Sequence, residues 1–152
     1  MKKTILVLLC VFIINNDVTY AVAPKVLTMS QICPNTGDKE YIVCKIKETF
    51  PEEPDVMLAI AIAESQLNND AVGYNCYYEG KSTSCKKGDK HLAWSSDSGL
   101  FQIHKASEHE KTLEGNLQAA RKLYDKRNKS PWCAYTSGAY LKYLPEARSM
   151  IK

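Results

Sequence analysis

The sequence predicts a mostly α-helical domain of the α+β class, with a central buried helix and a small β-hairpin excursion. Helical hydrophobic patterns recur along the chain, whereas strict alternation of apolar and polar residues is rare. One run, 56–63, is apolar on every face, which is typical of a helix buried in a core. Residues 71–96 are rich in glycine, serine, asparagine, lysine and tyrosine, which favours a loop containing a hairpin.

The N-terminal residues 1–21 have the layout of a secretory signal peptide. Lys2 and Lys3 supply a positive start, and an unbroken apolar run follows at 5–14. This run is shorter than the ~20 residues that a membrane span requires. We therefore expect no stable membrane insertion after cleavage, with an uncleaved anchor as the alternative.

Small residues at Ala21 and Ala23 offer two cleavage points. Cleavage after Ala23 would leave Pro24 at the new terminus, so we place the cut after Ala21. Residues 22–152 then form the mature domain, secreted into the periplasm or outside the cell. Its formal net charge falls from +3 to +2, because the leader carries two lysines and one aspartate. This mild charge suits an anionic cell wall and ordinary solubility equally well, and no basic stripe with interleaved aromatics indicates nucleic acid.

Five cysteines remain after the leader is removed, and export favours disulfides among them. No C-x-x-C pair is present, which argues against a zinc or thioredoxin-type site. Cys33 and Cys44 bracket a segment with proline and glycine, and Cys76 and Cys85 bracket a polar stretch. The expected bridges are 33–44 and 76–85, although spacing alone does not fix connectivity. Cys133 would then be a buried free thiol.

The apolar periodicity and the helix-breaking residues predict where each helix begins and ends. The first covers 41–50 and stops at Pro51, which cannot donate the next helix hydrogen bond. The central helix starts at Pro54 and Asp55 and ends near Leu67. Three further segments are expected to be helical, namely a short helix at 99–104, an amphipathic helix at 116–127, and a helix at 132–143 interrupted near 136–138.

Glu64 comes at the C-terminal end of the apolar helix. A carboxyl group that leaves an apolar core is partly desolvated, which disfavours its charged form. The negative end of the helix dipole acts in the same direction. Both effects favour a carboxyl that is protonated near neutral pH, as general-acid catalysis requires. The alternative is a glutamate that merely ends a helix in solvent.

Four short blocks resemble, in order, signature motifs of the lysozyme-like superfamily. Together they cover about residues 55–143, and the set is closest to the soluble lytic transglycosylases. The blocks are Glu64-Ser65-Gln66-Leu67-Asn68 with Ala71, Gly99-Leu100-Phe101-Gln102-Ile103, Asn116-Leu117 with Ala120, and Ala134-Tyr135-Thr136-Ser137-Gly138. The strip 95–103 also looks like the S-x-D-x-G-x-x-Q-I strip of c-type lysozymes. The chain departs from the pattern at Thr136, where asparagine is usual, and in the cysteine-bounded insertion 76–85.

The resemblance implies a lysozyme-like fold and a role for each matching residue. Glu64 matches the catalytic acid. Ser65 and Gln102 match residues that line the glycan cleft, and Tyr135 matches a tyrosine close to the catalytic carboxyl. Asp97 fills the position of a second carboxylate if the c-type strip is the right guide. The alternative for Asp97 is a loop carboxylate that caps the short helix expected at Gly99.

The resemblance implies cleavage of peptidoglycan glycan strands at the β-1,4 bond between N-acetylmuramic acid and N-acetylglucosamine. A lytic transglycosylase forms 1,6-anhydro ends, whereas a hydrolytic lysozyme uses water. An inactive binding module on the same frame is a third alternative. No cofactor and no metal are expected, because His104 and His109 lack the H-E-x-x-H order. The cluster of Tyr74, Tyr77 and Tyr78 either stacks on sugars or packs within the loop.

Overall fold

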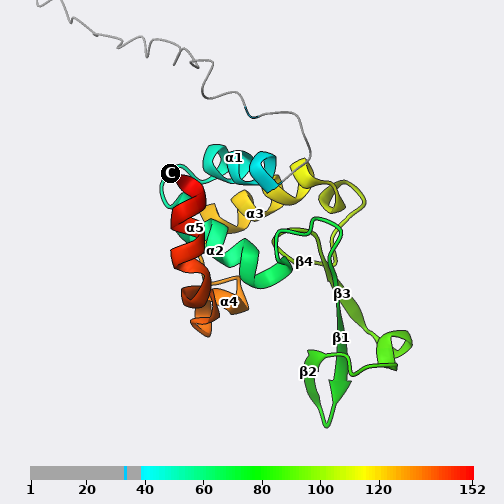
Figure 1. The fold of residues 1–152 in the computed structure, drawn as a ribbon. Coiled ribbons are helices and arrows are strands. Elements are labelled where there is room, and N and C mark those ends of the chain that lie inside the picture. Colours follow the sequence, from blue (N-terminus) through cyan, green and yellow to red (C-terminus); the bar gives the residue numbers. More distant parts are fainter. Residues whose placement is uncertain (1–32, 34–38) are drawn as a thin grey trace, which may run out of the picture. The chain divides into compact units, whose positions relative to one another are not determined.

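Helices and one four-stranded sheet make up the part of the chain that the computed structural model describes, which is Cys33 and residues 39–152 (Figure 1). The predicted signal peptide, residues 1–21, lies outside these residues. The α+β class is confirmed. No helix in the described part is long and apolar enough to cross a membrane. The helices are α1 Lys39–Thr49, α2 Pro54–Ser65, α3 Leu113–Arg127, α4 Cys133–Thr136 and α5 Leu144–Ile151, with 3-10 segments η2 Asp89–Leu92, η3 His109–Lys111 and η4 Ala139–Tyr143.

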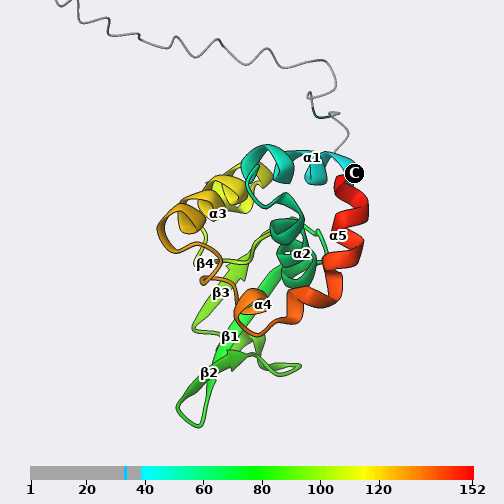
Figure 2. The same ribbon diagram turned by 90° about the vertical axis from the view of Figure 1, so that its left-hand side faces the viewer.

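The core is built around α2, which confirms the central buried helix. Every residue from Met57 to Ile62 is buried. Elements α1, α4, η4 and α5 pack against it, and Figure 2 shows α2 lying among them. The helix ends because Gln66 adopts a left-handed conformation (φ 57°) and its N–H donates to the Ile62 carbonyl at 2.9 Å. Glu64 therefore lies in the last turn of the most buried helix.

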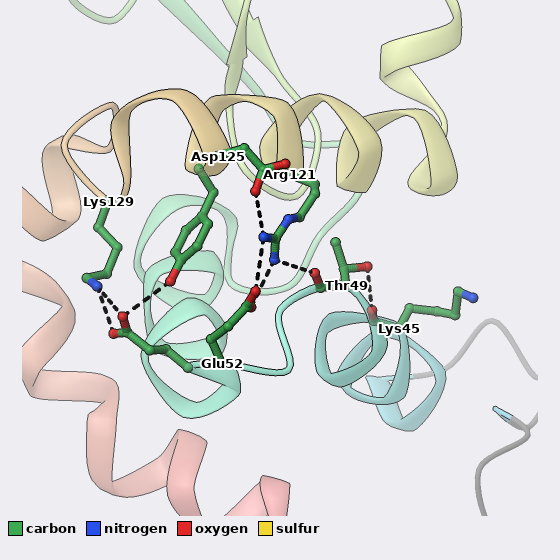
Figure 3. A network of polar contacts seen from close by, with 8 residues as sticks. Lys45, Thr49, Glu52, Arg121, Asp125 and Lys129 are labelled. Atoms are coloured by element: carbon green, nitrogen blue, oxygen red, sulfur yellow. Dashed lines mark hydrogen bonds and ion pairs between the residues drawn. The ribbon is translucent and has the colours of Figure 1, made fainter. Parts of the chain in front are cut away.

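A polar network fastens the start of α2 to α3 (Figure 3). Arg121 donates to both Glu52 carboxylate oxygens at 2.9 and 3.0 Å, and to the Thr49 carbonyl at 3.1 Å. Lys129 donates to both oxygens of Glu53 at 2.6 and 2.7 Å. Glu52 is half exposed, so its ion pair contributes little stability in water, but the paired contacts fix where α2 begins.

The sheet has the strand order β2-β1-β3-β4, and every neighbouring pair is antiparallel. The strands are β1 Val72–Tyr78, β2 Lys81–Ser84, β3 Ser95–Ser98 and β4 Ile103–His104. Strands β1 and β2 form the hairpin that the composition of 71–96 predicts. In Figure 1 this hairpin extends away from the helices, while β3 and β4 lie nearer to them.

The helix expected at 99–104 is wrong, because this segment is a turn that leads into β4. Gly99 (φ 81°) and Gln102 (φ 47°) adopt left-handed conformations that an α-helix does not contain. The buried Asn116 side chain holds the turn: it accepts from the Phe101 N–H at 2.8 Å and donates to the Ser98 carbonyl at 2.9 Å. A tertiary contact thus overrides the local helical pattern.

Both expected disulfides are confirmed, Cys33–Cys44 and Cys76–Cys85. They are compatible with the oxidising compartment that export implies. Cys133 is a free thiol, but its predicted burial is wrong, because its side chain is exposed. Its neighbours Trp132 and Ala134 are 3% and 7% exposed, so they fill the inward positions of this short turn and leave Cys133 facing outward.

Alkylation of the oxidised mature protein, without reduction, is expected to label one cysteine, Cys133. The reason is that the other four mature cysteines are paired and an exposed thiol is accessible to reagent. Intact-mass measurement and peptide mapping check the number and the site. Labelling of Cys76 or Cys85 would contradict the structure, and the Cys133→Ser variant, which is expected to take up no label, serves as the control.

Candidate active site

Glu64 is half buried where the C-terminal end of α2 meets α4. Burial raises the pKa of its carboxyl, a hydrogen bond from the Ala134 N–H lowers it, and the negative charge of Asp97 raises it further. The net result is a pKa above the usual glutamate value. This is the direction of shift that the sequence predicts for a carboxyl at the end of an apolar helix.

The first residues of α4 hold Glu64 in place. The Ala134 N–H donates to Glu64 Oε1 at 3.0 Å. Ala134 is 7% exposed, and the neighbouring Trp132 is buried with its indole N–H on the Phe101 carbonyl at 3.1 Å. The donor therefore belongs to a fixed part of the core. Among the described residues, the other Glu64 oxygen, Oε2, has no hydrogen-bond partner.

Asp97 lies on β3, in the cross-strand position opposite Gly73 of β1 and His104 of β4. Both of its carboxylate oxygens have partners. Asn75 Nδ2 donates to Oδ2 at 3.0 Å, and His104 Nδ1 lies 2.8 Å from Oδ1. Asp97 is thus a strand residue, and its alternative role as the cap of a helix at Gly99 is excluded because that helix does not form.

His104 and Asn75 are site residues that sequence reasoning missed. Both belong to strands and share a sheet face with Asp97: His104 is directly paired with it, and Asn75, which is paired with Ser95, reaches it diagonally. The alternation around Asn75 could have indicated a strand. The position of His104 opposite Asp97 could not be read from the sequence, because a helix was expected over 99–104.

Two of the predicted substrate-binding residues have side chains engaged with the backbone. Ser65 is 8% exposed, and its hydroxyl donates to the Ala61 carbonyl within α2 at 3.0 Å. Gln102 Nε2 donates to the Ala71 and Gly99 carbonyls at 3.2 and 2.9 Å. Both residues flank the site and shape it, and their contact with a glycan stays a prediction.

Tyr135 follows the residue that binds Glu64, but its ring faces other groups. It stacks on Tyr140 with ring centroids 5.1 Å apart, and the Lys129 ammonium lies 5.4 Å from its ring centroid. No hydrogen bond joins the Tyr135 hydroxyl to Glu64 among the described residues. The structure therefore brings Glu64 and Asp97 together, and it places Tyr135 beside them through its backbone.

A separate groove of about 450 Å³ lies between α1 and α3. It contains none of the predicted site residues. Four of its seven lining residues are charged, and Arg121 among them is already paired with Glu52 and Asp125. The lining residues are Lys45, Thr49, Glu114, Leu117, Gln118, Arg121 and Lys122.

Comparisons with protein-family models, curated proteins and solved structures found no match to the chain.

Proposed function

We propose that this protein cleaves the glycan strands of peptidoglycan, with Glu64 as the general acid and 1,6-anhydro ends as the product. The observation that carries the proposal is the half-buried Glu64 carboxyl, whose pKa is raised and whose Oε1 is held by the Ala134 N–H. A carboxyl that stays protonated near neutral pH can donate to a glycosidic oxygen. The ordered blocks that resemble lytic transglycosylases supply the substrate class.

In the proposed reaction, the Glu64 proton moves to the oxygen that links the two sugars. The bond from this oxygen to the anomeric carbon then breaks, and positive charge develops on the remaining sugar. The Glu64 carboxylate next takes the proton of that sugar's 6-hydroxyl, and the hydroxyl oxygen bonds to the anomeric carbon. The products are a free 4-hydroxyl and a 1,6-anhydro ring, so water is not consumed.

The hydrolytic alternative is favoured by one observation, the second carboxylate of Asp97 close to Glu64. Its charge contributes to the raised pKa of Glu64. In hydrolysis of the lysozyme type, a second carboxylate stabilises the developing positive charge on the sugar or attacks its anomeric carbon. Here both Asp97 oxygens are engaged by Asn75 and His104, which suits electrostatic support better than attack on carbon.

Mass spectrometry of purified peptidoglycan after digestion distinguishes the alternatives. Muropeptides carrying 1,6-anhydro-N-acetylmuramic acid would support the transglycosylase. Products with ordinary reducing ends would assign the protein to the hydrolases. Glycan strands that stay intact after prolonged incubation would favour the third alternative, an inactive binding module.

Asp97→Asn is expected to reduce the cleavage rate on the order of tenfold, equivalent to about 1.4 kcal/mol of barrier. Because the Asp97 charge raises the pKa of Glu64, its removal lowers that pKa. The loss of activity at high pH should therefore begin at a lower pH than in the wild type. Rates measured by wall turbidity across pH check both effects.

His104→Gln is the matched comparison, because it removes a partner of Asp97 and leaves the carboxylate charge in place. It should shift the high-pH limb less than Asp97→Asn does. Near-total inactivation of Asp97→Asn, together with reducing-end products, would instead identify Asp97 as essential to a hydrolytic mechanism.

A further inference from the structure

Large apolar side chains are exposed on β1 and in the segment between β2 and β3. Five large hydrophobic residues of the described chain are exposed, and four of them lie between positions 72 and 94. Tyr77 is 59% exposed and Trp94 is 41% exposed. Their rings form a pair with centroids 5.1 Å apart. A neighbouring pair of exposed aromatic rings on a small domain is typical of a binding surface.

This aromatic pair shares a sheet face with Asp97. Side chains alternate along a strand, so Gly73, Asn75 and Tyr77 of β1 project from one face. Their cross-strand partners on that face are Asp97, Ser95 and Ser82 in the same order. The Trp94 indole N–H reaches Ser82 Oγ at 3.3 Å. A continuous row thus runs from the candidate active site to the aromatic pair.

The same alternation separates Tyr77 from the other two tyrosines of the insertion. Tyr78 lies on the opposite face, where its hydroxyl donates to Asp89 Oδ2 at 2.6 Å. Tyr74 also projects there, with the Lys90 ammonium 5.2 Å from its ring centroid. Of the three, only Tyr77 is available to stack on a ligand beside the candidate active site.

We propose that this row binds the glycan strand beyond the bond that is cleaved, with Tyr77 and Trp94 as a stacking platform for N-acetylhexosamine rings. The inference rests on the proposed function and adds that the site binds several sugar rings of the glycan at once. Gly73 and Tyr77 are about 13 Å apart at the usual strand rise. That length exceeds one pyranose ring, so the occupant is an oligosaccharide.

The chemistry of the row matches a sugar chain. The C–H face of a pyranose ring is apolar and stacks on an aromatic ring, while its hydroxyl and acetamido groups need hydrogen-bond partners. Asn75 Nδ2 already donates to Asp97 and Ser95, and Ser82 Oγ accepts from Trp94. The amide oxygen of Asn75 and the hydroxyl protons of Ser95 and Ser82 make no hydrogen bond among the described residues, so a sugar can bond to them. A lipid or the dry core of a protein interface would leave such groups without partners, at a cost in free energy.

The platform is held in place before any ligand arrives. The Cys76–Cys85 disulfide ties β1 to the end of the hairpin, and Cys76 itself is 1% exposed. The Cys85 N–H also donates to the Tyr74 carbonyl at 2.8 Å. A preorganised surface loses less conformational entropy on binding. The insertion that departs from the lysozyme-like pattern thereby acquires a role.

Tryptophan fluorescence tests the proposal, because the chain has two tryptophans and Trp132 is only 3% exposed. Quenching by iodide therefore reports on Trp94. In the Glu64→Gln protein, which does not turn over, the hexamer of N-acetylglucosamine should protect Trp94 from iodide in a saturable way. Tyr77→Ala should weaken the hexamer affinity about tenfold. Leu141→Ala, which alters an exposed apolar residue on η4, should leave it unchanged.

Several results would overturn the proposal. One is a failure of the hexamer to protect Trp94 from iodide at millimolar concentration, and another is an equal hexamer affinity in Tyr77→Ala. A third is protection of Trp94 that grows with protein concentration in the absence of sugar, which would identify a second copy of the chain as the occupant. Digestion of cell walls is measured separately, with the wild-type protein that keeps Glu64. Digestion without hexamer protection of Trp94 would remove the platform and keep the proposed function, whereas protection without digestion would do the reverse.

Discussion

Replacing Glu64 by glutamine is expected to slow glycan cleavage by about 10²–10⁴-fold, the contribution typical of a general acid. Glutamine preserves the size of the side chain and can still accept the Ala134 hydrogen bond, but it has no proton to give to the glycosidic oxygen. Turbidity loss of a wall suspension, followed over hours, measures the rate.

The same substitution is expected to stabilise the fold at neutral pH. The folded-state pKa of Glu64 lies above its unfolded value, so folding favours the protonated form. This contribution is fully present below the ordinary glutamate pKa of 4.5 and is lost as pH rises through the raised pKa. The melting temperature of Glu64→Gln should therefore match that of the wild type at acidic pH and exceed it at pH 8.

Glu108→Gln provides the control, because the Glu108 side chain is 90% exposed and its carboxylate pairs with Lys111 rather than with a residue of the candidate site. It should change neither the cleavage rate nor the pH dependence of melting. If Glu64→Gln retained half of the wild-type rate, the proposed mechanism would be wrong. If it melted earlier than the wild type at pH 8, Glu64 would instead be a structural carboxylate.

Asn116→Ala is expected to lower the free energy of unfolding by roughly 3–5 kcal/mol, because it leaves several buried backbone groups unpaired. Asn116 is fully buried at the start of α3. It accepts from Phe101 and donates to the carbonyls of Ser98 and Glu110, the latter at 2.9 Å. One side chain thus joins α3 to the turn between β3 and β4.

Urea unfolding followed by far-UV circular dichroism measures this change. Gln118→Ala is the matched control: it removes an exposed amide from the same helix and should change stability by less than about 0.5 kcal/mol. Asn116→Asp should be at least as destabilising as Asn116→Ala, because the buried carboxylate keeps the bond from Phe101 but faces the Ser98 and Glu110 carbonyls without a proton to donate. An Asn116→Ala variant as stable as the control would contradict the role assigned to this residue.

The sequence was informative wherever local patterns agree with the tertiary structure. The apolar run 56–63 predicted α2, proline at position 51 marked the end of α1, and cysteine spacing indicated both disulfides. The prediction of a helix at 99–104 was wrong for a physical reason. Its conformation depends on hydrogen bonds from Asn116, which lies in another helix, and on left-handed residues whose need is visible only in three dimensions.

In the candidate site too, the sequence predicted what depends on one segment and missed what depends on contacts between segments. Glu64 was predictable, because burial at the end of an apolar helix is a property of its own segment. The partners of Asp97 were not, because Asn75 and His104 meet it only through strand register. Helix α5 was not predicted, although Pro145 and Glu146 in its first turn are local signals of a helix start. The Tyr77–Trp94 pair joins different segments and depends on the tertiary structure.

The outward-facing Cys133 gives the chain a ready attachment point for spectroscopic probes. It precedes Ala134, whose N–H donates to Glu64 Oε1, and Cys33, Cys44, Cys76 and Cys85 are tied in disulfides. A nitroxide or fluorophore placed there without any mutation would sit within one residue of Glu64's anchor. A second label on the hairpin turn at Gly80 would then allow the distance between α4 and the hairpin to be measured with and without substrate.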